Sequence, residues 1–562
     1  MGIGPTCTAT LRRYESKSAL EREKREMDLK QLTFSTLLAE QCVTQGDRPC
    51  ILFEGRTYSY ADVDRLSSSI AGGLVDAGVR HGTKVAILID NKPEIVLLYL
   101  GLAKIGAVAV PLNTAAKGEL LALYIEKSDA EYAVCDSEYV ARIAAILDRT
   151  TIKAVYSIDE HNEVEADALS CTVTLRDFRE LVRHAAVARP DLCPKHIDPF
   201  MLLYTSGTTG RSKASLATHH SALTIGLIMA EAYGYTPDDV LYICLPLFHG
   251  NAWQCATVPA LVAGAAIAIT RRFSTSAFWK EVRECGATQF NIMSSMTNFL
   301  WSQPASSADR DHRVKQCMLV PTPAAFYDEF KQRFGIVAIQ SLYALTDVGV
   351  VSITTSADPE SKRLSAGKPN HRFDVQIVGE EDEPLPVGTT GEIVVRNREP
   401  WIMPRGYYND WERTVTAWQN LWFHTGDRGY FDEDGYLYFV DRKKDAIRRR
   451  GENISSYEVE QIILKHPAVR DAAAYPLASE HSEDEVAVSV IVREGSELSE
   501  KQLIEHCREN MPYFMVPRYL EFTETLPCTM TGKVEKYKLQ QSASNRMDKI
   551  WDREKVGIKI SR

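Results

Sequence analysis

Residues 84–112 read KVAILIDNKPEIVLLYLGLAKIGAVAVPL, with a short apolar run, a helical stretch from Glu94 and a second apolar run at 107–111. This order is typical of a β-strand, an α-helix and a parallel β-strand. Similar short apolar runs return at residues 132–135, 241–244 and 265–269. The sequence therefore predicts an α/β fold with more than one sheet of stacked βαβ units.

The pattern of apolar and polar residues changes twice further along the chain. From Arg372 the apolar runs become shorter and are separated by turn signals, which predicts a β-rich subdomain. After the charged stretch 441–445, the pattern predicts a small α+β domain with helices from Ser456 and Ser499 and strands near Ala472 and over 486–492. We expect a large N-terminal domain followed by a small one.

The expected boundaries follow from these changes. They are an N-terminal extension over residues 1–30, a large domain over 31–440, a hinge at 441–445, a C-terminal lid domain over 446–543 and a tail over 544–562.

Composition excludes several classes of function. The 562 residues are 45% hydrophobic and 25% charged, as in ordinary soluble globular proteins. The formal net charge of -10 gives no general attraction to nucleic acid or to anionic lipid. The longest apolar stretch, residues 95–112, is interrupted by Lys104 and two glycines, so we expect no transmembrane segment. The 12 cysteines form no Cys-x-x-Cys pair, which argues against a zinc site and fits a cytoplasmic protein.

A loop rich in hydroxyls and glycines follows an apolar run at residues 202–213, LLYTSGTTGRSK. Its backbone N–H groups and hydroxyls can donate to phosphate oxygens, while Lys213 offsets their charge. The glycine spacing excludes a Walker A loop. Taken alone, the segment also fits a Ser/Thr-rich surface loop. The candidate phosphate-binding residues are Thr205, Ser206, Gly207, Thr208, Thr209, Gly210 and Lys213.

This loop resembles the phosphate-loop motif of the adenylate-forming superfamily of acyl-CoA synthetases (AMP-dependent ligases), adenylation domains and luciferases. The match is unbroken from Tyr204 to Gly210, whereas Ser212 replaces the usual proline and Ala214 the usual glycine. Further stretches resemble the other motifs of that family in the same order, over residues 35–543. The segments 101–107, 276–279 and 438–442 look most like the crotonobetaine/carnitine-CoA ligase branch.

The resemblance implies where ATP and magnesium bind. In Tyr343-Ala344-Leu345-Thr346-Asp347, Thr346 would contact phosphate and Asp347 would hold Mg²⁺, although the family has a glutamate there. Tyr343 would belong to the same nucleotide site. Asp427 of Thr425-Gly426-Asp427 would accept hydrogen bonds from both ribose hydroxyls, and Arg442 would reach the same sugar. Taken alone, Asp347 also fits a helix cap or a solvated acid, Asp427 a turn residue and Arg442 a solvated charge.

The resemblance also implies a reaction in two halves. A carboxylate would attack the α-phosphorus of ATP to give an acyl-adenylate and pyrophosphate, with Lys533 as the catalytic lysine. The small domain would then rotate about Lys444, and the thiol of CoA would take the acyl group. The residues implied on the thiol side are His249, Arg448, Gly451, Glu452 and Asn453.

The resemblance further implies an acyl pocket, formed by residues that lie beside these motifs in the sequence. Its candidate residues are Trp253, Met293, Ser294, Ser295, Ala344 and Val348, each of which could equally be plain core. The acid itself and the oligomeric state are not identified by the sequence. Two other functions stay open: an adenylate-forming enzyme with a non-CoA acceptor, such as a carrier-protein thiol or an amine, and a non-catalytic nucleotide-binding protein.

Overall fold

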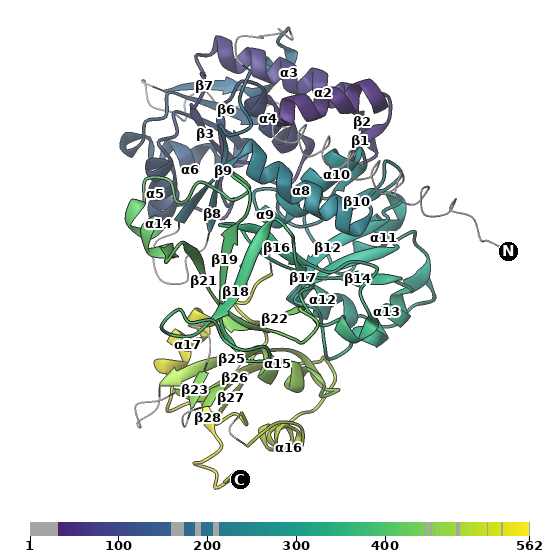
Figure 1. Cartoon of the computed structure of the whole chain (residues 1–562), viewed down its shortest axis with the longest axis vertical. Helices are drawn as coiled ribbons and strands as arrows, with labels where there is room; N and C mark the ends of the chain where they lie inside the picture. Colours follow the sequence, from purple (N-terminus) through teal and green to yellow (C-terminus); the bar gives the residue numbers. More distant parts are fainter. Residues whose placement is uncertain are drawn as a thin grey trace, which may run out of the picture. The chain divides into compact units, whose positions relative to one another are not determined.

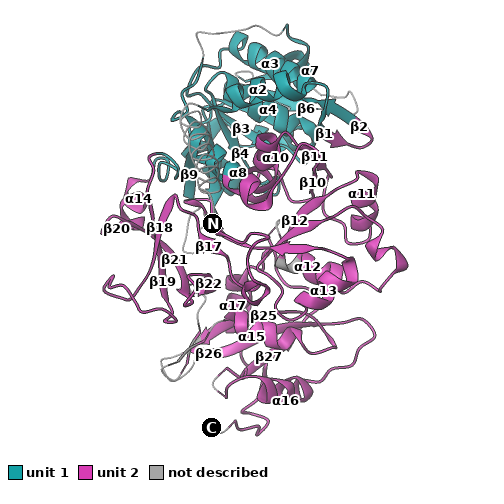
Figure 2. Cartoon of the chain, turned by 45° about the vertical axis from the view of Figure 1, so that its right-hand side comes forward, with its two compact units in different colours: residues 1–51, 57–227, 401–409 teal, residues 52–56, 228–400, 410–562 magenta. Residues whose placement is uncertain are grey.

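The computed structural model describes residues 32–158, 173–185, 193–205, 213–442, 447–449, 452–454, 456–478, 484–513, 515–529 and 532–560, apart from the side chains of residues 294, 295, 442, 448, 452, 453 and 478. The chain divides into two compact units, coloured separately in Figure 2. Unit 1 comprises Met1–Ile51, Thr57–Leu227 and Trp401–Asn409. Unit 2 comprises Leu52–Arg56, Ile228–Pro400 and Asp410–Arg562.

Unit 1 is built on a seven-stranded sheet with the order β7-β6-β5-β3-β4-β8-β9 (Figure 1). Its strands are β3 (Lys84–Leu88), β4 (Val108–Pro111), β5 (Tyr132–Asp136), β6 (Ala154–Ile158), β7 (Thr174–Asp177), β8 (Pro199–Thr205) and β9 (Lys213–Thr218). Neighbours run parallel except for the antiparallel pair β8 and β9. The parallel order agrees with the βαβ pattern of the sequence.

Helices accompany this sheet along the chain. They are α2 (Phe34–Gln45), α3 (Tyr60–Asp76), α4 (Pro93–Lys104), α5 (Gly118–Ser128), α6 (Val140–Ala144), α7 (Phe178–Arg183) and α8 (His219–Tyr233), which continues into unit 2. Helix α3 begins at Ser59 because the Ser59 hydroxyl accepts from the N–H of Asp62, whose carboxylate accepts from the N–H of Ser59. Helix α4 is apolar nearly all round, and its residues from Ile95 to Ala103 are all buried.

Unit 2 contains a second mainly parallel sheet, whose order β14-β13-β12-β10-β11 continues to β1 and β2. The strands are β1 (Pro49–Phe53), β2 (Arg56–Ser59), β10 (Val240–Ile243), β11 (Ala266–Ile269), β12 (Gln289–Met293), β13 (Gln316–Val320) and β14 (Ala338–Gln340). The helices are α9 (Gly250–Ala252), α10 (Val258–Ala263), α11 (Phe278–Glu284), α12 (Ser294–Trp301) and α13 (Tyr327–Phe334). The two sheets confirm the predicted α/β fold with more than one sheet.

The predicted β-rich subdomain is also present in unit 2. One antiparallel sheet contains β18 (Phe373–Val378), β19 (Gly391–Asn397), β20 (Trp418–Gln419), β21 (Trp422–Phe431) and β22 (Leu437–Arg442), with helix α14 (Trp411–Ala417) before β20. A second contains β15 (Leu342–Leu345), β16 (Gly349–Ile353) and β17 (Lys368–Pro369). The Thr-Gly-Asp and Tyr-Ala-Leu-Thr-Asp motifs lie on β21 and at the β15–β16 turn.

The C-terminal part of unit 2 is a small α+β domain. Its elements are the hairpin β23 (Ile447–Arg449) and β24 (Glu452–Ile454), the sheet β25 (Val469–Ala478), β26 (Asp484–Val492), β27 (Tyr519–Phe522) and β28 (Trp551–Asp552), and the helices α15 (Ser456–Leu464), α16 (Glu500–Asn510) and α17 (Lys536–Ser544). The two helices and two strands predicted here from the sequence all form.

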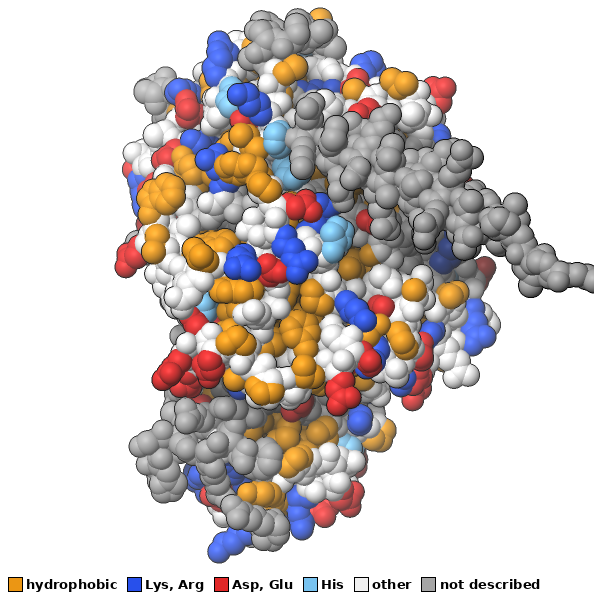
Figure 3. Space-filling model, viewed as in Figure 1, with side chains coloured by type: hydrophobic (Ala, Val, Ile, Leu, Met, Phe, Trp, Pro, Cys, Tyr) orange, Lys and Arg blue, Asp and Glu red, His pale blue; other side chains and the backbone are white. Residues whose placement is uncertain are grey.

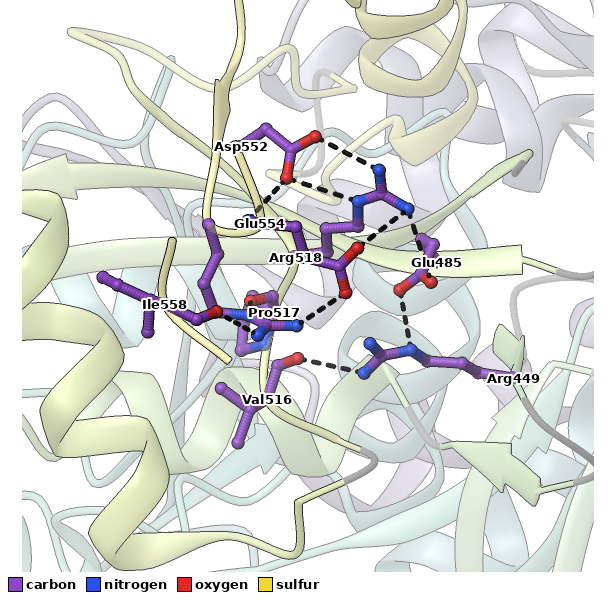
Figure 4. A network of polar contacts seen from close by, with 9 residues as sticks. Arg449, Glu485, Val516, Pro517, Arg518, Asp552, Glu554 and Ile558 are labelled. Carbon is purple, nitrogen blue, oxygen red and sulfur yellow. Dashed lines mark hydrogen bonds and ion pairs between the residues drawn. The ribbon is translucent and has the colours of Figure 1, made fainter. Parts of the chain in front are cut away.

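A network of arginines ties the hairpin and the end of the chain to this domain (Figure 4). Arg449, which is 3% exposed, pairs with Glu485 of β26 at 2.7 Å. Arg518 lies 3.7 Å from the same carboxylate and 3.2 Å from Asp552 of β28. The sequence set residues 544–562 apart as a tail, but in the structure strand β28 pairs with β27 and belongs to the domain's sheet.

Three further properties of the described residues concern membrane-spanning helices, cysteines and surface charge. None of their helices is long and apolar enough to cross a bilayer. Their cysteines are free thiols. On the face drawn in Figure 3, basic and acidic side chains are intermixed rather than gathered into one basic field.

Candidate active site

Two of the predicted nucleotide-binding residues contact each other in unit 2. The phenol of Tyr343 on β15 donates a hydrogen bond of 2.8 Å to Oδ2 of Asp427 on β21, and both residues are buried. The ring of Phe439 stacks on Tyr343 with centroids 6.2 Å apart. The carboxylate is therefore held in one orientation, with further acceptor capacity for a ligand.

The backbone before Asp427 is shaped by its own motif. The hydroxyl of Thr425 donates to the carbonyl of Ile393 (2.7 Å) and accepts from the N–H of Asp427 (3.1 Å). Gly426 has φ 71°, a left-handed conformation that favours glycine, and its N–H donates to Glu392. In the ladder between β21 and β22, Asp427 is the direct partner of Arg442, so the backbone places the two predicted ribose residues opposite each other.

Thr346 and Asp347 lie in the tight turn between β15 and β16. The N–H of Val348 closes this turn on the carbonyl of Leu345 at 3.1 Å, and both motif side chains remain partly exposed. No group of three or more His, Cys, Asp or Glu residues in the described chain could hold a metal ion by itself. One partly exposed residue with a carboxylate, Asp347, nevertheless fits magnesium, because Mg²⁺ commonly takes one or two carboxylates and fills its shell with phosphate oxygens and water.

His249 and Lys533 lie near each other in unit 2. His249 is exposed at its surface, and desolvation by the neighbouring protein lowers the pKa of its imidazole to about 4, with the charge of Lys533 acting in the same direction. Lys533 is exposed and follows Gly532, whose φ is 78°. The carbonyl of Lys533 accepts from the N–H of Thr529 at 2.8 Å, which closes a turn that presents the lysine.

The predicted acyl-pocket residues differ in exposure. Trp253 opens a π-helical turn, Trp253–Thr257, and has no exposed surface, and neither has Val348. Ala344 and Met293 are partly exposed, and the Met293 sulfur accepts from Nδ2 of Asn251 at 3.7 Å. The backbone of residues 294 and 295 begins α12, but their side chains lie outside the described part of the chain.

The phosphate-loop candidates belong to unit 1. Thr205 ends β8 and Lys213 begins β9, and the two are direct partners in the antiparallel ladder. Nζ of Lys213 donates to the hydroxyl of Tyr407 at 3.3 Å and lies 4.5 Å from its ring centroid. Residues 206–210, which hold the other candidates, fall outside the described residues.

Comparison with known proteins decides the family. A model described as AMP-binding enzyme matches residues 38–408, and one described as AMP-binding enzyme C-terminal domain matches residues 458–533. The chain belongs to the AMP-binding enzyme family. ATP, Mg²⁺ and CoA are the usual substrates and cofactors of this family.

Relatives of this AMP-binding enzyme carry ligase names. A crotonobetaine/carnitine–CoA ligase of Salmonella paratyphi B is 31% identical over 507 residues, which cover 88% of this chain and 96% of the relative. The protein of that name in Salmonella typhimurium is 31% identical over 504 residues, with the same coverage of both chains. The family predicted from the sequence motifs is therefore confirmed, and so is the likeness to that branch.

Solved structures share the fold. An anthranilate CoA ligase, AuaEII, in complex with anthranoyl-AMP has a TM-score of 0.83 at 21% identity, covering 92% of this chain and 98% of its own. ATP-bound MatB from Rhodopseudomonas palustris has a TM-score of 0.81 at 24% identity, covering 92% and 99%. The arrangement of a large N-terminal part and a smaller C-terminal part is that of adenylate-forming enzymes.

For several predicted site residues of this AMP-binding enzyme, the structure describes the backbone alone or does not describe the residue. Arg448 and Asn453 are direct partners across β23 and β24, and Glu452 lies beside them, with all three side chains outside the described residues. Lys444 and Gly451 fall outside them entirely.

At the predicted hinge, the structure adds partners of Asp441 that the motifs did not include. Asp441 is buried, and its Oδ2 accepts from the N–H and the hydroxyl of Ser456 at 2.7 and 2.6 Å. Lys536 donates to the same hydroxyl at 2.5 Å and pairs with Glu460 at 2.8 Å. The sequence offered one signal for this cluster, an acidic residue in the predicted hinge. The partners of Asp441 lie 15 or more residues away, so no local pattern includes them.

A hydrogen bond also joins the C-terminal domain to helix α12, which follows the acyl-pocket candidate Met293. Nδ2 of Asn298 on α12 donates to Oδ1 of Asp471 on β25 at 3.0 Å. Burial raises the pKa of Asp471 to about 6. No local pattern in the sequence predicts this pair, since its members are 173 residues apart.

Proposed function

We propose that this enzyme is an AMP-forming acid–CoA ligase, which converts a carboxylic acid, ATP and CoA into an acyl-CoA, AMP and pyrophosphate. One relationship supports the proposal most. Lys533 acts electrically on His249, and a methyl group added to the next residue, Gly250, would lie 3.7 Å from Oγ1 of Thr346. These two relationships connect His249 with Lys533, and its neighbour Gly250 with Thr346.

The first half-reaction uses charge stabilisation around these residues. An oxygen of the carboxylate forms a bond to the α-phosphorus of ATP, and the bond from that phosphorus to the bridging oxygen of pyrophosphate breaks. Lys533 offsets negative charge on the phosphates, and Thr346 donates to them. Asp427, oriented by Tyr343, accepts from the ribose hydroxyls, and we assign Arg442, its partner in the backbone ladder, to the same sugar. Asp347 would hold Mg²⁺, which neutralises phosphate charge when bound.

The second half-reaction transfers the acyl group to sulfur. The thiolate of CoA attacks the acyl carbonyl, the acyl–oxygen bond to AMP breaks, and AMP leaves. We place Arg448, Gly451, Glu452 and Asn453 on the face that meets the thiol arm after rotation about Lys444. A pKa of about 4 keeps His249 neutral near pH 7, so we assign it to lining the thiol path by hydrogen bonding, not to storing a proton.

The phosphate loop completes the proposal. We assign the β- and γ-phosphates to Thr205, Ser206, Gly207, Thr208, Thr209, Gly210 and Lys213. The ladder pairing of Thr205 with Lys213 supports a hairpin that carries this loop. A cytoplasmic location and the hinge at residues 441–445 belong to the same proposal.

A non-CoA acceptor is the second candidate function. Ala344 and Asp347 both depart from the family's motif, at the positions assigned to the acyl pocket and to the metal. These two departures favour a different acceptor. The acid is open in both cases, and crotonobetaine and carnitine are included among the acids to test because the relatives are named for them.

The experiment measures pyrophosphate release from ATP and Mg²⁺ over a panel of carboxylic acids, each with and without CoA. The ligase predicts release that becomes multiple-turnover only when CoA is present. Release that is equally fast without CoA would move the assignment to another acceptor. Absence of release with every acid would contradict adenylate formation. The variant Lys538→Ala, at an exposed lysine of α17, controls for loss of surface charge.

A further inference from the structure

The hairpin β23–β24 is held to the C-terminal domain by a buried arginine. Arg449 follows Arg448 on β23, and its side chain points into the domain, where Nε lies 2.7 Å from a carboxylate oxygen of Glu485 on β26 (Figure 4). Its Nη1 donates to the carbonyl of Val516 at 3.2 Å. Arg449 therefore fixes the strand in which Arg448 is the direct ladder partner of Asn453.

A chain of ion pairs continues from Glu485 to the last strand. Arg518, just before β27, lies 3.7 Å from the other oxygen of Glu485 and 3.2 Å from Asp552 of β28. Nε of Arg518 also donates to Asp552 at 3.3 Å, so two nitrogens of the guanidinium bind that carboxylate. Glu485 and Asp552 are both buried. Buried pairs are screened little by water, so the two ends of this chain of ion pairs are electrostatically linked.

The far end of this chain of ion pairs lies beyond the part of the protein that the family model covers. The match to the C-terminal domain of AMP-binding enzymes ends at residue 533, whereas β28 comprises Trp551–Asp552. The next residue is tied to the domain as well. Arg553 is buried and donates to the carbonyls of Pro517 at 3.2 Å and Ile558 at 2.7 Å. The end of the chain is thus built into the support of the hairpin.

We propose that the chain of ion pairs from Arg449 to Asp552 positions the hairpin β23–β24 for acyl transfer to CoA. Glu485, Arg518 and Asp552 are then positioning residues, because they act through the hairpin. This inference rests on the proposed function, which assigns that hairpin to the thiol arm and adenylation to other residues. Buried ion pairs add little stability over apolar packing, whereas a guanidinium binds carboxylates in defined directions and so fixes orientation.

The test measures the two half-reactions separately in Glu485→Gln and Asp552→Asn, which keep the size of the side chain and remove one charge. Pyrophosphate exchange reports adenylation, and acyl-CoA formation from the supplied adenylate of the best acid reports thiol transfer. In both variants we expect kcat/KM for CoA to fall at least about tenfold and exchange to stay within about twofold of the wild type, because a displaced binding group is costly. Glu521→Gln is the matched control. It weakens the pair with Arg546, at 2.8 Å on the same sheet, which takes no part in the network of Figure 4.

Hydrogen exchange separates positioning from a general loss of stability. Well below the Tm of each variant, exchange of the amides over residues 447–454 should rise, while that of β25 stays at the wild-type rate. Asp552 acts through Glu485, so the double variant should lose no more thiol transfer than the more severe single variant. Unchanged acyl-CoA formation in both variants, or an equal loss in both half-reactions, overturns the inference. Absence of acyl-CoA formation by the wild-type enzyme instead contradicts the proposed function.

Discussion

The hydroxyl of Tyr343 donates to the carboxylate of Asp427 at 2.8 Å, and this buried contact joins two motifs that lie 84 residues apart in the chain. Tyr343 comes from β15 and Asp427 from β21, which belong to different sheets of unit 2. The nucleotide site proposed here is therefore assembled by packing between sheets and not by one local segment.

Tyr343→Phe removes this donor and keeps the stacked ring. A hydrogen bond to a charged group contributes about 1.5–3 kcal/mol, so the KM for ATP should rise roughly tenfold or more. The KM for the acid should stay within about twofold, because Tyr343 is assigned to the nucleotide alone. Steady-state kinetics with each substrate varied in turn measure both values. Tyr430→Phe is the matched control, since Tyr430 on β21 stacks on Tyr438 on β22 and has no role in the proposal. Equal effects of the two variants would contradict the assignment.

Lys533→Ala separates the two half-reactions. The lysine is assigned to the phosphates in adenylation, and loss of such a contact costs about 3 kcal/mol in the transition state, or roughly 100-fold in rate. Thiol transfer from a supplied acyl-adenylate should keep most of its rate. Pyrophosphate exchange and acyl-CoA formation, measured separately, test this split against Lys538→Ala. A similar loss in both halves would show that Lys533 has another role.

The buried carboxyl of Asp471 makes stability depend on pH. Its pKa is raised to about 6 in the folded chain, so the folded state binds more protons than the unfolded state between about pH 4 and pH 6. The contribution of this group to stability therefore falls as pH rises through that window and levels off above it. Asp471→Asn can keep the contact with Asn298 without the charge. Its free energy of unfolding should gain about 1 kcal/mol over the wild type between pH 5 and pH 8, as urea titrations can measure. A constant difference at the two pH values would contradict the raised pKa.

Asp552→Ala tests the last strand. Asp552 faces Arg518 at 3.2 Å with almost no exposed side-chain surface, and removal of one partner of a buried ion pair costs about 3–5 kcal/mol. We expect a clear fall in the Tm of the C-terminal domain. Asp548→Ala, a few residues earlier and exposed, is the control. An unchanged Tm would mean that residues 544–562 behave as the tail that the sequence suggested.

Local patterns predicted most of the fold. The run at residues 84–112 became β3, α4 and β4, because β-branched and apolar runs of this length have few other ways to be buried. Ser499 was predicted to begin a helix, and it caps α16 together with Gln502. Motif order was equally informative about the family, because the phosphate loop, the Thr346 turn, Asp427 and Lys533 keep their spacing.

Partners that are distant in the sequence could not be predicted in this way. Tyr407 contacts Lys213 from 194 residues away, and Asn298 contacts Asp471 from 173. Such pairs are set by how sheets and helices pack, which no window of neighbouring residues contains.

The central claim is that a carboxylate oxygen of the acid becomes bonded to the α-phosphorus of ATP. The most direct measurement uses the best acid of the panel with both carboxylate oxygens labelled with ¹⁸O, together with ATP, Mg²⁺ and CoA, and weighs the products by mass spectrometry. The account predicts AMP with one labelled oxygen, acyl-CoA with the other, and unlabelled pyrophosphate. Label in pyrophosphate or phosphate, or AMP without label, would contradict it.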